Sequence, residues 1–210
     1  MLKNLKAALL YPATDPTRVS KVGQWWLFCL LFFTTPALLG HYVSVIKQSF
    51  QDPQETEVPG FNRFDKLFFS GIALYAGFAF LQLIPGLPNF TVFAINIFLS
   101  KDSEPGFLFF LCFGIHLSIM LAALLLWPAL CMQYAESGWL AMFKLKEVLG
   151  KALLCVREYL FLVVYPFLAW LILMLLCVTV VGIVLLIPAI PFLVIGHARL
   201  IGLYMHQHLS

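Results

Sequence analysis

The chain has 210 residues, of which 62% are hydrophobic and 11% are charged, and its formal net charge is +3. An average soluble domain carries about 25% charged residues, so the composition excludes an ordinary water-soluble domain. Most of the folded surface is expected to face lipid, and residues 1–210 are expected to form a single membrane domain.

The N-terminal residues predict a helix that lies in the membrane interface. Four leucines fall on one face, whereas Lys3 and Lys6 lie towards the other, and this amphipathic pattern is typical of an interfacial helix. The helix is expected to stop at Tyr11-Pro12, before a polar turn. No small-residue cleavage site follows a short apolar core, so a signal peptide is not expected.

Residues 22–46 form the first apolar stretch, and its centre contains two breaks, Thr34-Thr35-Pro36 and Gly40-His41. Proline removes a backbone hydrogen-bond donor and disfavours helix in the residue before it. A kinked full crossing and a re-entrant hairpin both fit these breaks.

The middle of the chain predicts two crossings with a short segment between them. Residues 67–84 are apolar and are expected to stop at the prolines of Pro85-Gly86-Leu87-Pro88. Residues 89–100 are too few to span a bilayer, which takes about 20 residues, so they are expected to lie along the surface or dip in. Residues 106–130 predict a well-defined crossing.

Residues 137–154 predict a second amphipathic surface helix. Its apolar and charged residues oppose each other: Trp139, Met142, Phe143, Val148 and Leu149 on one side, and Lys144, Lys146, Glu147 and Lys151 on the other.

Residues 159–196 contain no Asp, Glu, Lys or Arg, and their length is close to two crossings. They predict a transmembrane hairpin of residues 159–178 and 183–203. The turn is expected at residues 179–182, because Gly182 accepts backbone angles that other residues resist.

The distribution of Lys and Arg favours one topology. If residues 22–46 cross fully, the two sides hold eight and five of these residues; if they re-enter, the split is twelve against Lys101 alone. The positive-inside rule favours the second arrangement. We therefore expect an all-α polytopic protein with four full transmembrane helices plus one re-entrant or fifth crossing. Both termini and the two amphipathic interfacial helices are expected in the cytoplasm.

A weak internal repeat is present, because residues 36–46 resemble residues 191–201 and each follows a surface helix. The spacings differ, so a chance match remains an alternative. If it is genuine, residues 1–50 and 137–208 are related halves, an arrangement that occurs in transporters.

Short motifs in order along the chain resemble those of a known family. They are Tyr11-Pro12 with Asp15, Gly40-His41-Tyr42, Pro59-x-Phe61 before Asp65-x-Leu67, Tyr134-Ala135-Glu136-x-Gly138, and Gly196-His197-Ala198-x-Leu200-x-Gly202-x-Tyr204. In these motifs the chain resembles a prokaryotic family of multi-pass membrane proteins, domain of unknown function 4013. His41 departs from the Gly-Tyr-x-x-Arg form expected there. The resemblance implies a multi-pass protein of the prokaryotic cytoplasmic (inner) membrane and implies no activity.

Apart from Tyr and Cys, the ionisable groups deep in the apolar stretches are His41, His116 and His197. Proton-coupled carriers usually keep an acid or base in the membrane, and no Asp or Glu is held that way here. The histidines could ligate haem or a metal, but we interpret them as hydrogen-bonded to protein. The five cysteines form no CxxC pair, and His206 and His208 belong to a polar tail. No catalytic residue, metal or cofactor is predicted.

Basic residues around aromatic surface helices give the clearest functional signal, because each contributes about 1 kcal/mol of attraction to an anionic leaflet. They are Lys47, Arg63, Lys66, Lys144, Lys146, Lys151, Arg157 and Arg199. Ordinary anchoring explains them, and so does a non-enzymatic function in binding anionic lipid headgroups or a partner membrane protein. The alternatives are a small permease or lipid-handling transporter, as a homo-oligomer, and a haem- or metal-binding membrane enzyme. No nucleic acid partner is expected.

Overall fold

The computed structural model describes residues 2–30, 35–99, 107–177 and 180–209, and every regular element among them is helical. The all-α class is therefore confirmed. In chain order the elements are α1 (Leu2–Thr14), α2 (Arg18–Leu30), α3 (Thr35–Gln51), α4 (Phe64–Leu99), α5 (Phe107–Ser137), the 3-10 helix η2 (Trp139–Phe143), α6 (Leu145–Leu153), α7 (Val156–Cys177) and α8 (Val180–Leu209).

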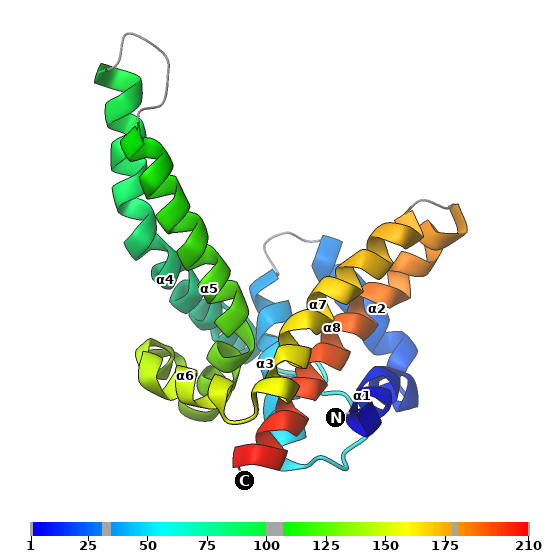
Figure 1. The fold of residues 1–210 in the computed structure, drawn as a ribbon. Helices are drawn as coiled ribbons and strands as arrows, with labels where there is room; N and C mark the ends of the chain where they lie inside the picture. The colour runs from blue at the N-terminus through cyan, green and yellow to red at the C-terminus, as the bar shows by residue number, and fades with distance from the viewer. Residues whose placement is uncertain (1, 31–34, 100–106, 178–179, 210) are drawn as a thin grey trace.

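The long helices pair as antiparallel hairpins, α2 with α3, α4 with α5 and α7 with α8. The open ends of these hairpins meet at one end of the molecule, which we call the base (Figure 1). Both termini, α1 and α6 also lie at the base. From the base the α4–α5 pair and the α7–α8 pair diverge as two arms (Figure 1).

Four helical segments are long and apolar enough to cross a membrane, as the sequence predicts for four full crossings. They are Phe64–Leu81, Phe113–Ser137, Val156–Leu175 and Ala189–Leu209. The 13 residues of α2 extend only about 20 Å, which is short of the ~30 Å of hydrocarbon.

Residues 22–30 and 35–46 belong to two helices, α2 and α3, and residues 31–34 lie outside the described residues. Hydrogen bonds join the chain before α2 to the chain after α3. The backbone N–H of Val58 donates to Oδ2 of Asp15 at 2.8 Å, and Oη of Tyr11 donates to the carbonyl of Glu57 at 2.8 Å. A single crossing would separate these groups by about 30 Å. The structure therefore agrees with the re-entrant alternative.

The predicted stop at Pro85-Gly86-Leu87-Pro88 is wrong, since α4 continues as one helix to Leu99. Residues 89–99 accordingly extend the α4–α5 arm and do not form a separate surface segment. A proline inside a helix costs about 3 kcal/mol. Leaving the helix in lipid would expose several backbone groups with no partner, at several kcal/mol each, so the helix persists.

Three other predicted boundaries also move. The first helix runs through Pro12 to Thr14. Residues 137–154 are not one helix, because Gly138 adopts a positive φ of 84° after α5 and Lys144 separates η2 from α6. Of the turn predicted at residues 179–182, residues 180–182 lie inside α8, and residue 179 lies outside the described residues.

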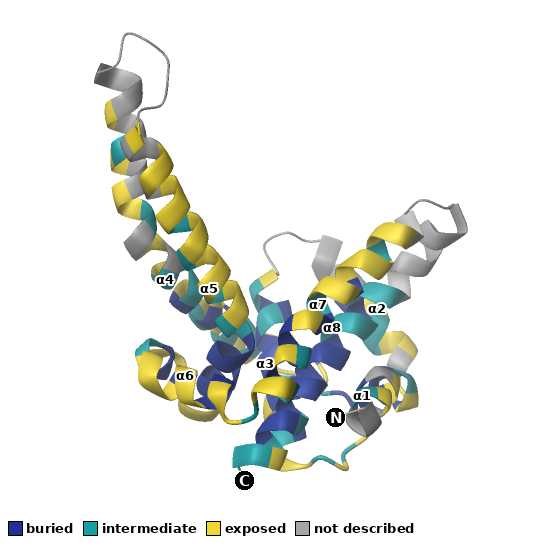
Figure 2. Ribbon diagram, viewed as in Figure 1, coloured by how far each residue is buried: buried dark blue, intermediate teal, exposed yellow. Residues whose placement is uncertain are grey.

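Buried side chains gather at the base, where the hairpins meet, whereas the described parts of the arms are largely exposed (Figure 2). Helix α3 lies at this centre and packs mainly on α4 and α8. Its contact with α4 is very close: a Cβ added to Gly40 would lie 1.8 Å from the carbonyl oxygen of Leu67, and one added to Gly71 would lie 1.6 Å from that of Pro36. Only glycine permits this approach, so these positions fix how α3 crosses α4.

Candidate functional site

His41, near the middle of α3, is completely buried and both of its ring nitrogens are bonded. Its Nε2 lies 2.7 Å from the carbonyl oxygen of Pro59, and its Nδ1 lies 3.3 Å from Nε1 of Trp25. A carbonyl only accepts and an indole N–H only donates, so the bonds fix the neutral tautomer with hydrogen on Nε2. The ring also stacks on Phe61 at 4.4 Å.

His197, on α8, is held in a similar way, and its partner on α3 is Tyr42, the residue that follows His41. Its Nδ1 accepts from Oη of Tyr42 at 2.8 Å, and its Nε2 donates to the carbonyl of Leu162 at 3.0 Å. The ring stacks on Tyr165 at a centroid distance of 5.4 Å. His197 therefore joins α3, α7 and α8.

These contacts give a physical reason for the two histidines without a cofactor. Each ring nitrogen that could coordinate a metal is already held by a protein group, and buried polar groups need such partners. Removing one partner from any of these hydrogen bonds would leave a buried donor or acceptor unsatisfied, which costs about 1–3 kcal/mol. His41 and Tyr42 are adjacent, so the two networks form one polar junction between the helices at the base.

Arg199 also belongs to the protein interior. Only 5% of the residue is exposed, its guanidinium lies 4.2 Å from the centroid of the Tyr11 ring, and it donates to Oγ of Ser49 and to the carbonyl of Pro53. Burial raises the pKa of Tyr11 to about 12, so the ring under the cation stays neutral. Arg199 fastens the loop after α3 onto α8 and does not reach outward to headgroups.

Asp15 is the acidic centre of the same region and has no exposed surface. Burial works to raise its pKa, but hydrogen bonds from Lys21, from Thr17 and from the backbone of Val58 outweigh burial and hold the pKa at about 2. The carboxylate therefore carries its charge at neutral pH and pairs with Lys21 at 2.7 Å.

Twelve of the thirteen Lys and Arg residues lie in or directly beside the helix ends that meet at the base, and Lys101 lies outside the described residues. Of the eight basic residues that the sequence proposes for lipid or partner binding, six have exposed side chains: Lys47, Arg63, Lys66, Lys144, Lys146 and Arg157. Arg199 is buried as described, and Lys151 is buried in an ion pair with Glu136.

The segment η2–α6 presents an apolar surface to the outside of the protein. Leu145, Leu149 and Leu153 recur every four residues and are 56%, 48% and 60% exposed, whereas Val148 is buried against the core. Residues four apart share a helix face, so the leucines form one exposed stripe beside the exposed Lys146. The predicted apolar face was therefore partly wrong: Met142 and Val148 are buried against the protein, whereas Trp139 and Leu149 of that face are exposed.

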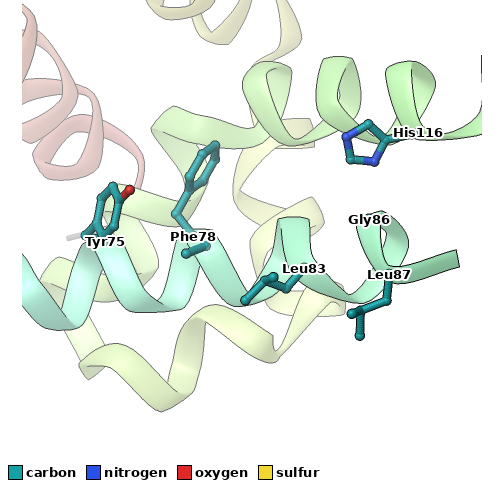
Figure 3. Close-up of a pocket in the computed structure, with 7 residues that line it drawn as sticks. Tyr75, Phe78, Leu83, Gly86, Leu87 and His116 are labelled. Carbon is teal, nitrogen blue, oxygen red and sulfur yellow. The ribbon is translucent and has the colours of Figure 1, made fainter. Parts of the chain in front are cut away.

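The third predicted histidine, His116, lies on the α4–α5 arm and lines an open apolar pocket of about 640 Å³ (Figure 3). Tyr75, Phe78, Leu83 and Gly86 of α4 line the same pocket. Nδ1 of His116 is buried and has no hydrogen-bond partner among the described residues. The structure thus joins His41 and His197 through Tyr42 and places His116 in a different environment.

Sequence reasoning missed Tyr42 and Trp25 as parts of the polar junction, and it also missed the buried ion pair of Asp15. Tyr42 follows His41 directly, and that adjacency was the one available signal. The partners of Asp15 and His41 lie 43 and 18 residues away, so no spacing rule could have paired them.

These helices and their apolar surfaces define an all-α polytopic membrane protein. Residues 25–190 match the family described as "Protein of unknown function (DUF4013)", and the chain belongs to that family. No curated protein and no solved structure matches this chain.

Proposed function

We propose that this protein is a non-enzymatic component of the inner membrane, with its base in the cytoplasm, that binds anionic lipid headgroups through η2–α6. The observation that carries the proposal is the exposed stripe of Leu145, Leu149 and Leu153 beside Lys144 and Lys146. A helix with this combination places its apolar side chains at the level of the acyl chains while its lysines meet lipid phosphates.

The way η2–α6 is held supports the proposal. Lys151 pairs with Glu136 of α5, and Glu147 accepts a hydrogen bond from Gln133 of α5. The segment is therefore fixed to the base by its polar residues, and its apolar face is directed away from the protein. Because twelve basic residues lie at the same end, the positive-inside rule favours a cytoplasmic base.

A small permease is less well supported. A transporter built on the repeat would need polar groups between its halves, and the two histidines there, His41 and His197, have both ring nitrogens bonded to protein.

The test measures, by native mass spectrometry, the lipid that copurifies from nanodiscs of neutral or anionic lipid. It compares the unmodified protein with the double variant Lys144→Gln/Lys146→Gln. Two lysines at about 1 kcal/mol each should weaken retention of anionic lipid roughly 30-fold at low salt. The unmodified protein should lose this preference as salt rises, and neutral lipid should be unaffected.

Lys47→Gln/Arg63→Gln removes the same charge from exposed positions outside η2–α6 and serves as the control. This control should lower the amount of bound anionic lipid less than Lys144→Gln/Lys146→Gln does. Equal effects of the two pairs would leave general anchoring as the explanation. If the variant kept its bound lipid but lost a copurifying protein, the ligand of η2–α6 would be a partner protein and not lipid.

A further inference from the structure

Three side chains with metal-binding chemistry meet where α7 begins and α8 ends. The sulfur of Cys155, a carboxylate oxygen of Glu158 and a ring nitrogen of His208 all lie within 4.8 Å of one another. Nε2 of His208 lies 3.0 Å from Oε2 of Glu158. In a tetrahedral zinc site with bonds of about 2.0–2.3 Å the ligand atoms are roughly 3.3–3.8 Å apart, so small side-chain rotations suffice to enclose an ion.

The local fold holds these residues in place. Cys155 and Glu158 are three residues apart at the start of α7 and share a face of the chain there. Tyr204 lies one helical turn before His208 on α8; its Oη donates to the carbonyl of Lys151 and accepts from the backbone N–H of Cys155. The Tyr204 ring also contacts the His208 ring at 4.7 Å. Tyr204 therefore positions both the cysteine and the histidine.

We propose that Cys155, Glu158 and His208 bind a divalent transition-metal ion of the zinc type. A thiolate, an imidazole and a carboxylate are all ligands that Zn²⁺ takes, whereas Mg²⁺ and Ca²⁺ take oxygen. The two anionic ligands balance the charge of the ion, which keeps the site neutral beside the membrane. All three residues are partly exposed, so water can reach the ion and complete its coordination.

The bound ion clamps the C-terminal end of α8 to the start of α7. The ion takes the place of the proton shared by His208 and Glu158, and the thiol of Cys155 binds as a thiolate. Metal binding therefore releases protons. This inference does not depend on the proposed lipid function, because none of the three ligands belongs to the leucine stripe or to the exposed lysines.

The experiment uses full-length protein in detergent, purified through a tag without histidine, and Co²⁺ as the probe. One Co²⁺ per chain should give a thiolate-to-cobalt charge-transfer band and tetrahedral d–d absorption, and equimolar Zn²⁺ should abolish both. Elemental analysis of protein purified without chelator should find a transition metal close to one per chain.

Cys155→Ser should remove the charge-transfer band, and His208→Ala should weaken binding by more than the 10–100-fold that changes to outer-shell groups cost. Tyr204→Phe should fall within that 10–100-fold range. His206→Ala is the matched control: it lies two residues from His208, its Nδ1 bonds to the carbonyl of Phe50, and it should bind Co²⁺ as the unmodified protein does.

Each ligand variant is first checked for thermal unfolding without metal, where it should match the unmodified protein. Absence of a charge-transfer band in the unmodified protein, or a band that persists in Cys155→Ser, overturns the proposal. Equal weakening by His206→Ala and His208→Ala does so as well.

Discussion

The hydroxyl of Tyr42 on α3 donates to Nδ1 of His197 on α8 at 2.8 Å, across 155 residues of sequence. Both residues are buried, so this bond ties the first hairpin to the last in a place where water does not compete.

Tyr42→Phe should lower the free energy of unfolding by about 1–3 kcal/mol, because Nδ1 of His197 would be buried without a donor. Thermal unfolding in detergent measures the change. Tyr75→Phe is the control, since Tyr75 on α4 is 63% exposed and should unfold as the unmodified protein does. Equal stability of the two variants would contradict the role assigned to the junction.

Gly71→Ala should destabilise the protein by about 1–3 kcal/mol through overpacking, because the new methyl group would overlap the carbonyl of Pro36. Gly114→Ala is the matched control on a neighbouring transmembrane helix, where a Cβ meets nothing within 4 Å. It should be neutral or stabilising by up to about 1 kcal/mol from helix propensity. A stable Gly71→Ala would mean that α3 and α4 cross at a greater distance.

Asp15→Asn should destabilise the fold by about 3 kcal/mol, as breaking a buried ion pair does. The amide would face the donors of Lys21 and Val58. Asp65→Asn, an exposed position at the start of α4, is the control and should have little effect.

The same carboxylate gives a pH dependence. Its pKa is lowered from 3.8 to about 2 in the folded protein, so its contribution to stability is complete above about pH 4 and is lost as the pH falls towards 2. Unfolding midpoints measured between pH 5 and pH 2 should fall more steeply for the unmodified protein than for Asp15→Asn. Parallel curves would show that another acid is responsible.

Topology is tested by labelling single cysteines, introduced into a cysteine-free background, from outside intact cells. Thr14→Cys and Gln54→Cys should behave alike, because hydrogen bonds join residues 11–21 to residues 57–58. With a cytoplasmic base both should be missed, and Ser103→Cys should be labelled. Labelling of Thr14→Cys without Gln54→Cys would require residues 22–46 to cross the membrane once.

The four spanning segments could be predicted from sequence because about 20 apolar residues are themselves the signal. The continuation of α4 through Pro85 and Pro88 could not, since the prolines act locally and the reason for the helix is the lack of any other backbone partner in lipid. The return of residues 22–46 could be inferred only from the count of Lys and Arg.

Side-chain burial at the base was the least predictable feature. In sequence, Lys151 and Arg199 resemble the exposed Lys146 and Arg157, yet Glu136 and Tyr11 hold them inside. Which basic side chains are exposed therefore depends on contacts across α5, α6 and α8. His208 was assigned to a polar tail for the same reason, because Glu158 and Cys155 precede it by about 50 residues.

The hairpin arrangement also bears on how the chain enters the bilayer during synthesis. Each helical pair can insert as a unit with both of its outer ends left on the ribosome's side. In the sequence, residues 31–34, 100–106 and 178–179 separate the two helices of each pair. The first and last of these segments carry no charge, and residues 100–106 carry Lys101, Asp102 and Glu104. With a cytoplasmic base, this net negative segment is the charged part that must be translocated. A membrane potential negative inside assists that step by about 2 kcal/mol per charge at 100 mV.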